Sequence, residues 1–269
     1  MWLTSSFGSN LAGQLCILPE DINCAASANA RPTLPRWPLA QRRSEQMPDR
    51  RAIMPDQSRP YPPSIDHLVW LAADLDTACK QFEAMSGVTP DYGGQHPGGT
   101  HNALVGLGES IYLEIAAPVP GAQEGHPWIN AARQKPEPHL FSYCMRPAGP
   151  LADLAKTAKA AGFDSLGPLP SSRELPNGDL LEWQLLIPHA AVSGGVIPFQ
   201  IDWLNSPHPS AGTEQTARLI RFEIAHPEPE MIRASIDLFA PQTAIIASNG
   251  GVHLHAQIET PRGVINLSS

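Results

Sequence analysis

The sequence has only four cysteines among 269 residues, and none of them stands in a CxxC or other tight metal-binding spacing. This pattern argues against a disulfide framework and against a zinc–thiolate site. Cys79 falls in a helical pattern and Cys144 in a strand-like one, so we expect both to be reduced structural residues in the core. We expect a cytoplasmic protein.

Long apolar runs and basic clusters are also missing. No stretch of about 18 apolar residues occurs, so nothing is expected to span a membrane. Residues 1–60 hold seven Arg and five Asp/Glu, the remainder holds eleven Lys/Arg and twenty-one Asp/Glu, and no basic cluster follows Arg59. Nucleic-acid binding needs a basic face that displaces counterions from phosphates, so we expect no nucleic-acid partner.

Two common catalytic motifs are absent. No G-x-S-x-G is present to mark the nucleophile of a serine hydrolase. No G-x-G-x-x-G stands between a strand and a helix either. The sequence therefore indicates neither Ser/His/Asp hydrolysis nor a nucleotide cofactor.

The first part of the chain lacks the pattern of a folded domain. Residues 31–63 are rich in Pro and Arg and show neither a helical nor an alternating apolar period. Such a segment cannot bury enough apolar surface to offset its ordering entropy. We expect residues 1–63 to be a disordered leader, or translation from an upstream start with Met54 as the natural one. The folded domain is expected over residues 64–269.

From residue 64 onward, strand and helix patterns alternate. Residues 64–71 form a short apolar run typical of a strand, Asp74 is a candidate helix N-cap, and Gly87 closes the helical pattern that follows. Residues 101–107 alternate like a strand, and a second strand, IYLEIA, comes soon after them. The unit is βαββ, with room for one more short strand in the Gly/Pro-rich loop.

A similar order then recurs. The second round has a strand at residues 140–145, a helix at 151–161 and strands at 180–187 and 197–204, so that Gly162 ends its helix as Gly87 ends the first. A third, shorter round follows. The sequence predicts module one over residues 64–118, module two over residues 139–206 and a C-terminal extension over residues 211–269.

The chain resembles the glyoxalase-like domain of the vicinal oxygen chelate superfamily in four segments: IDHLVWLAADLDTA, GGQHPGGTHNALVGLG, YLEIAAP, and IPFQIDW with the SPHPS that follows it. The resemblance covers roughly residues 64–210. It implies an α+β fold in which paired βαβββ modules form a cup-shaped mixed sheet. It also implies that divalent-metal ligands project inward from the first and last strands.

Three residues on these strands are the predicted metal ligands: His67, Glu114 and Asp202. His67 and Glu114 each interrupt an apolar strand, which is costly unless the two side chains are paired, solvated in a cavity or bound to a metal. Imidazole and carboxylate suit Zn, Mn, Fe, Co or Ni, and Glu114 would also hold or shuttle the reacting proton. The alternative is a satisfied core histidine, a solvent-facing Glu114 and a capping Asp202. We expect His67 and Glu114 to face each other across one cavity.

The second module supplies fewer ligands than the first. An offset of 75 residues places Ser142 opposite His67, and matching the last strands places Asp202 opposite Glu114. Serine is a poor metal ligand, so the site is either metal-free or completed by His101.

The glycine-rich loop at residues 93–99 permits positive φ and close backbone approach to a ligand, with a structural turn as the alternative. At its exit, Thr100, His101 and Asn102 are predicted to form a ligand-binding wall. His253 and His255 share one face of a strand, for which exposure or packing is favoured over metal binding. The remaining histidines are predicted to lie on the surface: His96, His126, His189, His208 and His226.

Two functions fit these features. The first is a glyoxalase-like lyase or isomerase that acts on a small oxygenated metabolite in a cup with a divalent-metal site. The second is a non-catalytic protein that captures an apolar or aromatic ligand in the same cup, lined by Trp70, Trp183 and Trp203. Both have a small molecule as partner, and a homodimer is compatible with either. The fold does not name the reaction.

Overall fold

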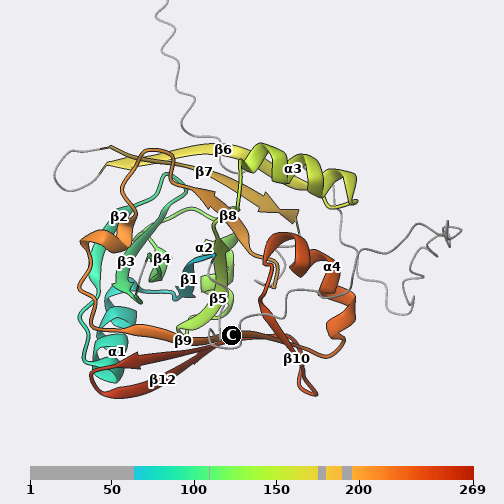
Figure 1. Cartoon of the computed structure of the whole chain (residues 1–269). Coiled ribbons are helices and arrows are strands. Elements are labelled where there is room, and N and C mark those ends of the chain that lie inside the picture. Colours follow the sequence, from blue (N-terminus) through green and yellow to red (C-terminus); the bar gives the residue numbers. More distant parts are fainter. Residues whose placement is uncertain (1–63, 109, 175–179, 190–195) are drawn as a thin grey trace, which may run out of the picture.

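The structure is a computed structural model that describes residues 64–269 except 109, 175–179 and 190–195 (Figure 1). The predicted leader, residues 1–63, lies outside the described residues. The described part forms an eight-stranded mixed sheet, a four-stranded sheet and the helices packed on them. None of its helices is long and apolar enough to cross a membrane.

The first five elements form a βαβββ unit: β1 (Ile65–Leu71), α1 (Leu75–Ser86), β2 (Asp91–Gln95), β3 (Thr100–Gly106) and β4 (Tyr112–Pro118). Asp74 is the N-cap of α1, where its side chain accepts a 2.8 Å hydrogen bond from the Thr77 N–H. Gly87 ends the helix at φ 76°, a left-handed conformation that glycine adopts at little cost. Both helix ends match the sequence prediction.

A second βαβββ unit follows α2 (Pro127–Gln134): β5 (His139–Met145), α3 (Leu151–Ala160), β6 (Ser165–Glu174), β7 (Leu180–Pro188) and β8 (Phe199–Asp202). The sequence analysis missed β6, whose SLGPLPSSRE sequence contains glycine and two prolines. It also left β2 as part of a loop. Both strands stand at the ends of the sheet, where proline and glycine interrupt fewer ladder hydrogen bonds.

The eight strands are ordered β2-β3-β4-β1-β5-β8-β7-β6, so each module contributes one half of the sheet. Strands β1 and β5 pair antiparallel at the centre, while β1–β4 and β5–β8 are parallel. The sheet curls until its end strands β2 and β6 come into contact (Figure 1). This architecture confirms the predicted α+β cup.

The C-terminal part forms a separate four-stranded sheet in the order β10-β9-β11-β12. Its elements are β9 (Arg218–His226), α4 (Pro229–Phe239), β10 (Ala244–Ala247), β11 (His253–Thr260) and β12 (Gly263–Ser268), preceded by the short helix η2 (Pro209–Gly212). Buried side chains of this sheet pack with those of β1, α1, β4 and β5 in one core cluster. The rings of Tyr143 and Phe222, for example, lie 4.7 Å apart.

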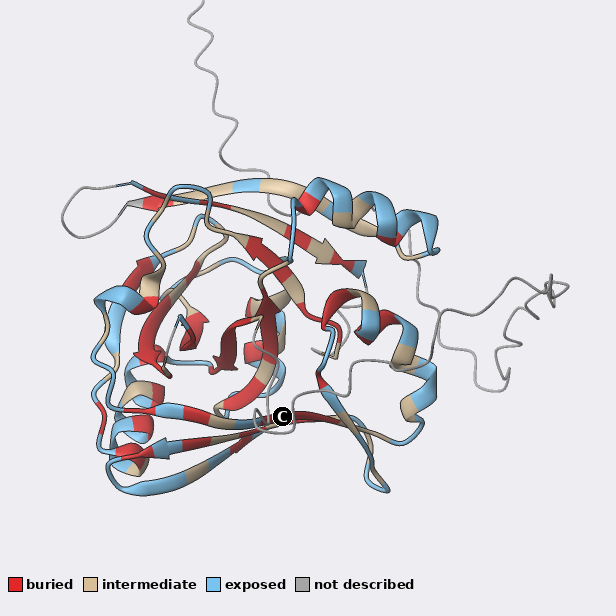
Figure 2. Cartoon of the chain, in the orientation of Figure 1, coloured by how far each residue is buried: buried red, intermediate tan, exposed pale blue. Residues whose placement is uncertain are grey.

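The two faces of β1 have different surroundings, because successive side chains of a strand point in opposite directions. Leu68 and Trp70 belong to the core that the second sheet covers, whereas Val69 and Leu71 pack toward α2 on the concave side. Figure 2 shows that β1, β4 and β5 are largely buried while α3 is mostly exposed. His67 lies two residues before Val69 and therefore shares its face of the strand, so it points into the cup.

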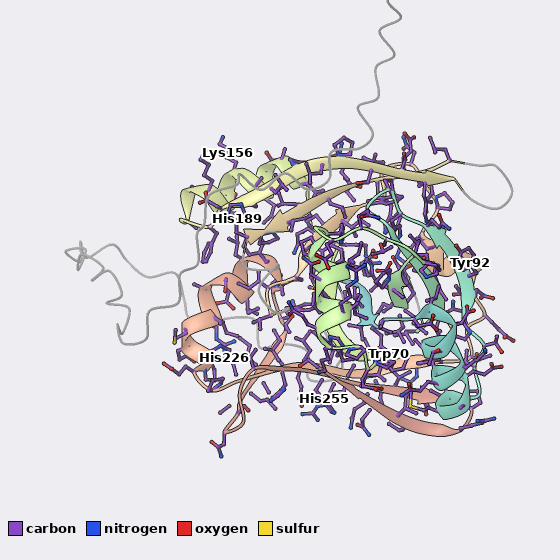
Figure 3. The ribbon with its side chains drawn as sticks, turned by 180° about the vertical axis from the view of Figure 1, so that it is seen from behind. Trp70, Tyr92, Lys156, His189, His226 and His255 are labelled. Atoms are coloured by element: carbon purple, nitrogen blue, oxygen red, sulfur yellow. The ribbon has the colours of Figure 1, made fainter. Side chains whose placement is uncertain are left out.

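This arrangement corrects the expectation for Trp70 (Figure 3). Its indole packs edge to face on Phe82 of α1, with ring centroids 5.9 Å apart. Trp70 therefore belongs to the core and does not line the cup.

Candidate functional site

His67 is held inside the cup by contacts on several sides. Its Nδ1 lies 2.7 Å from Oδ1 of Asp66, its ring stacks on Tyr112 at 4.6 Å, and Phe199 meets it edge-on at 5.4 Å. The side chain is only 3% exposed. These contacts fix the ring plane and direct Nε2 toward β4.

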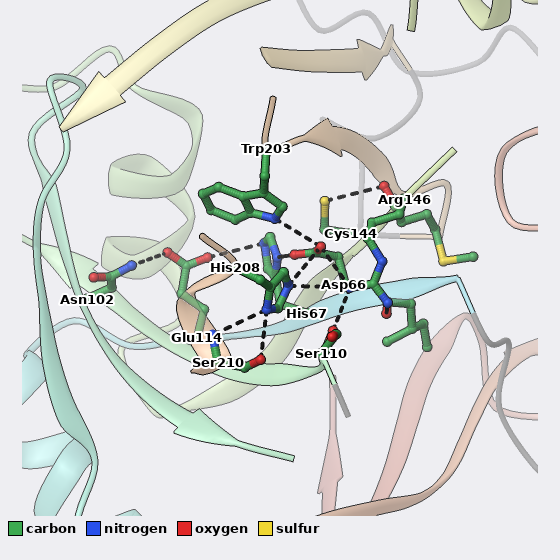
Figure 4. A network of polar contacts seen from close by, with 12 residues as sticks. Asp66, His67, Asn102, Ser110, Glu114, Cys144, Arg146, Trp203, His208 and Ser210 are labelled. Atoms are coloured by element: carbon green, nitrogen blue, oxygen red, sulfur yellow. Dashed lines mark hydrogen bonds and ion pairs between the residues drawn. The ribbon is translucent and has the colours of Figure 1, made fainter. Parts of the chain in front are cut away.

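Glu114 of β4 faces this nitrogen. Its Oε2 lies 3.6 Å from Nε2 of His67, and its Oε1 accepts a 2.7 Å hydrogen bond from Nδ2 of Asn102 (Figure 4). The carboxylate is buried. The two side chains thus lie close together inside the cup, as expected, while their role as metal ligands stays a prediction.

Asp66 is the centre of a second set of contacts that the sequence analysis missed. It is fully buried, and its Oδ2 accepts hydrogen bonds from Nη1 of Arg146 at 3.2 Å and from Nε1 of Trp203 at 3.1 Å. Nε2 of His208 lies 3.1 Å from the same oxygen. His208 is therefore half-buried in this network, and its prediction as a surface residue is wrong.

The charge of Asp66 follows from these partners. Burial by itself would raise the pKa of Asp66, but hydrogen bonds from His208 and His67, together with their charges, outweigh it and hold the pKa well below its usual range. The carboxylate is ionised at neutral pH, and its Oδ1 accepts a hydrogen bond from Nδ1–H of His67. This interaction favours the tautomer whose Nε2 carries a lone pair toward Glu114.

His96 was also predicted to lie on the surface, and the structure places it in the site instead. Its Nε2 lies 3.9 Å from Oε1 of Glu114, and its Nδ1 lies 3.0 Å from Oγ1 of Thr100. Burial lowers the pKa of His96 even though the nearby Glu114 acts in the opposite direction. The imidazole is therefore neutral near pH 7 and offers a lone pair.

The structure separates the three residues of the predicted wall, Thr100, His101 and Asn102, whose binding of a ligand stays a prediction. Thr100 and Asn102 share one face of β3 and both contact site residues. His101 points to the other face, because neighbouring side chains of a strand alternate. It lines a surface cavity of about 330 Å³ together with Asp74, Asp76 and Arg133. His101 cannot complete a metal site with His67.

The pairing of the strands also corrects the equivalence proposed for Asp202. Across β1 and β5, His67 pairs with Cys144 and Val69 pairs with Ser142. The offset of 75 residues between Gly87 and Gly162, both at positive φ, relates His67 to Ser142 and Val69 to Cys144. Val69 also pairs with Glu114 on β4, and Cys144 pairs with Phe199 on β8.

The counterpart of Glu114 is therefore Phe199 and not Asp202. The Asp202 carboxylate instead accepts a 2.9 Å hydrogen bond from the Leu204 N–H, which matches the capping alternative. The second module thus offers a serine and a phenylalanine at the two positions where the first offers His67 and Glu114.

Among the described residues, one group of three potential metal ligands has its ligand atoms within 4.8 Å of one another: Asp66, His67 and Cys144. Both oxygens of Asp66 are already engaged, and one of them contacts the cationic Arg146. Burial, followed by the charges of Asp66 and Glu114, raises the pKa of the Cys144 thiol well above its usual value. Metal binding here would require both a thiolate and the displacement of Arg146.

The other side of His67 carries a second set of donor atoms, which do not all lie within 4.8 Å of one another as those of Asp66, His67 and Cys144 do. The donor atoms on that side are Nε2 of His67, Nε2 of His96 and the carboxylate of Glu114, at the 3.6 and 3.9 Å separations given above. Two imidazoles and a carboxylate are ligand types that divalent transition metals bind. His253 and His255 lie apart from this set on β11, where they contact Gly250 and Glu223.

The sequence of residues 65–238, about two thirds of the chain, matches the family described as "Glyoxalase-like domain". The chain belongs to this glyoxalase-like family. Together with the paired βαβββ modules, the match places the protein in the vicinal oxygen chelate superfamily. No curated protein sequence matches the chain.

Solved structures resemble this glyoxalase-like protein in fold. A hypothetical protein from Staphylococcus aureus has a TM-score of 0.53 at 16% identity, covering 76% of this chain and 84% of that one. Methylmalonyl-CoA epimerase from Streptomyces coelicolor has a TM-score of 0.42 at 18% identity, covering 55% and 99%. The epimerase from Mycobacterium tuberculosis has a TM-score of 0.41 at 16% identity, covering 56% and 94%.

Proposed function

We propose that this glyoxalase-like protein is an enzyme of the lyase or isomerase type, and that Glu114 carries a proton to and from a small oxygenated substrate. The observation that carries the proposal is the buried Glu114 carboxylate facing the Nε2 atoms of His67 and His96. A buried carboxylate held between two imidazoles is suited to accept a proton from a carbon next to a carbonyl group and to return it. The fold itself does not specify the substrate.

The side chains around Glu114 prepare it for this role. The Asn102 amide donates to Oε1 and fixes the carboxylate, which leaves Oε2 on the side of His67. Asp66 holds the His67 ring and its tautomer. Because all three of these side chains are buried, the proton would be transferred with little competition from water.

We place a divalent metal at the same position as part of this proposal. Nε2 of His67, Nε2 of His96 and the Glu114 carboxylate would hold Zn, Mn, Fe, Co or Ni, with Asp66 supporting His67 through Nδ1. When bound, the metal would act as a Lewis acid on adjacent oxygens of the substrate. Elemental analysis of the purified protein tests this part, because a His67→Ala variant should lose the metal that the wild type retains.

Proton transfer is tested by deuterium exchange. The protein is incubated in D2O with dihydroxyacetone, glyceraldehyde, and 2-oxo and 2-hydroxy acids of two to four carbons, and loss of the C–H signals is followed by proton NMR. We expect exchange into at least one compound, and we expect Glu114→Gln to abolish it. Glu259→Gln, which changes an exposed carboxylate on the second sheet, is the matched control. Equal exchange by Glu114→Gln and wild type would contradict the proposal.

A second candidate function is non-catalytic capture of an aromatic molecule. The observation in its favour is a pair of indoles beside the site, since the rings of Trp183 and Trp203 lie 5.6 Å apart and Trp183 is 6.5 Å from His96. Quenching of tryptophan fluorescence by an aromatic ligand, without exchange or metal in the wild type, would favour this function. Cytoplasmic location and a homodimer also stay proposals.

A further inference from the structure

Arg173 of β6 is a buried cation that the proposed function does not use. It is only 8% exposed, and its Nη1 atom is buried without a hydrogen-bond partner among the described residues. No carboxylate in the described part of the chain lies within ion-pair distance of it. Burial lowers the pKa of the guanidinium, while Tyr112, Glu114 and Tyr92 act in the opposite direction.

Asn102 also presents a buried atom without a partner. Its Nδ2 donates to Glu114, but Oδ1 has no hydrogen-bond partner among the described residues. The amide cannot turn over to satisfy Oδ1, because that would place the oxygen against the Glu114 carboxylate. The same orientation of the Asn102 amide therefore holds the Glu114 carboxylate and leaves Oδ1 without a partner among the described residues.

Two adjacent glycines of β2 make room for these two atoms. The pairing of β2 with β3 is irregular between Tyr92 and Gly94, which is typical of a β-bulge. A Cβ atom on Gly94 would lie 2.6 Å from Nη1 of Arg173, and a Cβ on Gly93 would overlap Oδ1 of Asn102. The glycine-rich segment therefore accommodates the Arg173 and Asn102 side chains.

The two unpaired atoms specify complementary chemistry. A buried polar group without a partner costs about 1–3 kcal/mol, and more when it is charged. The guanidinium of Arg173 is satisfied best by an anionic oxygen, above all a carboxylate. Oδ1 of Asn102 needs a donor such as a hydroxyl. Nη1 of Arg173 and Oδ1 of Asn102 lie against the adjacent residues Gly94 and Gly93. Asn102 is bonded to Glu114, so one small molecule that carries the two groups on neighbouring carbons would satisfy both beside that carboxylate.

We infer that the substrate is a small 2-hydroxycarboxylate. Its carboxylate is bound by Arg173, and its hydroxyl donates a hydrogen bond to Oδ1 of Asn102. The inference rests on the proposed function in that both place the molecule beside Glu114. Arg173 is then a specificity-determining residue that selects acids over neutral hydroxy compounds.

Binding of three probes tests the inference: lactate, propionate without the hydroxyl, and propane-1,2-diol without the carboxylate. Affinities are measured by calorimetry or ligand-observed NMR for the wild type, Arg173→Gln, Arg173→Lys and, as the matched control, the exposed Arg218→Gln. We expect Arg173→Gln to weaken lactate binding by about 10- to 100-fold. Arg173→Lys should have an intermediate effect, since it keeps the charge but loses the planar fork. Arg218→Gln should bind as the wild type does.

Three outcomes would overturn the inference: no binding of lactate to the wild type, equal binding to the wild type and Arg173→Gln, or propane-1,2-diol binding as tightly as lactate. If Arg173→Gln does not fold, the comparison of wild type with Arg173→Lys decides. Glu114→Gln should still bind lactate. Loss of exchange in Glu114→Gln with unchanged binding in Arg173→Gln would refute this inference alone. Unchanged exchange in Glu114→Gln together with weakened lactate binding in Arg173→Gln would refute the proposed function alone.

Discussion

Replacing Asp66 with asparagine should lower the free energy of unfolding by about 3 kcal/mol. Breaking a buried charge pair by removing one partner costs about 3–5 kcal/mol. Asp66 is fully buried and contacts His67, Arg146, Trp203 and His208. We take the lower end of the range, because the Arg146 side chain is 29% exposed and water can partly satisfy it.

The effect of Asp66→Asn should depend on pH. The folded-state pKa of Asp66 lies below its unfolded value, so its contribution is complete above the unfolded pKa of about 3.9 and is lost as the pH falls toward the folded value. The difference in stability between wild type and variant should therefore be present at neutral pH, where Asp66 is ionised. It should shrink below about pH 4.

Urea unfolding followed by circular dichroism measures this difference, and a thermal scan should show a lower Tm by about 6–12 °C. Asp153→Asn is the control, since Asp153 is exposed on α3 and its replacement should change stability by no more than about 0.5 kcal/mol. If Asp66→Asn unfolds within about 1 kcal/mol of the wild type at neutral pH, the account of this network is wrong.

Three further substitutions test the core between the sheets, the bulge of β2 and the place of His101. Phe222→Ala removes a buried ring between the two sheets and should cost about 3–5 kcal/mol in urea unfolding, whereas Val264→Ala, at an exposed position of β12, should cost little. Gly94→Ala should destabilise the fold or shift Arg173, since the new Cβ has no room and φ is 138°; an unchanged Tm would count against the described bulge. His101→Ala should leave metal content and exchange unchanged, and a loss of either would place His101 in the site after all.

Local signals made much of the fold predictable. Asp74 and Gly87 lie at helix ends where capping oxygen and positive φ have specific sequence preferences. Strands β1 and β4 are mostly apolar runs, interrupted by Asp66 and His67 in the first and by Glu114 in the second. Strand β2 lies in the Gly/Pro-rich loop for which one more short strand was allowed, but its bounds were not predicted. Strand β6 was not predicted, because glycine and proline carry no strand preference and this strand is held by pairing to β7.

Residues of the site could be predicted only where a polar side chain interrupts an apolar strand. His67 and Glu114 interrupt apolar strands, and Asp66 gave the same signal beside His67 but was passed over. His96 and His208 lie outside apolar strands, where a polar residue is ordinary. The contact between Asp66 and His208 joins residues 142 positions apart, which no local pattern contains.

The equivalence of Glu114 and Asp202 failed for a related reason. Matching the two strands by sequence assumed that both end at the same point of the module. The observed register pairs Cys144 with Phe199, which shifts the second strand by three residues relative to that assumption. Register depends on pairing with β5 and β7, so the sequence of β8 alone does not define it.

The rate of deuterium exchange by Glu114→Gln, relative to the wild type, tests the central claim most directly. Glutamine keeps the size of the side chain and removes its ability to carry a proton. General acid–base groups typically contribute about 10²- to 10⁴-fold, so we expect the exchange rate to fall by at least about 100-fold while the Tm stays close to that of Glu259→Gln. A rate within a few-fold of the wild type, in a variant that remains folded, would contradict the assignment of Glu114 as the proton carrier.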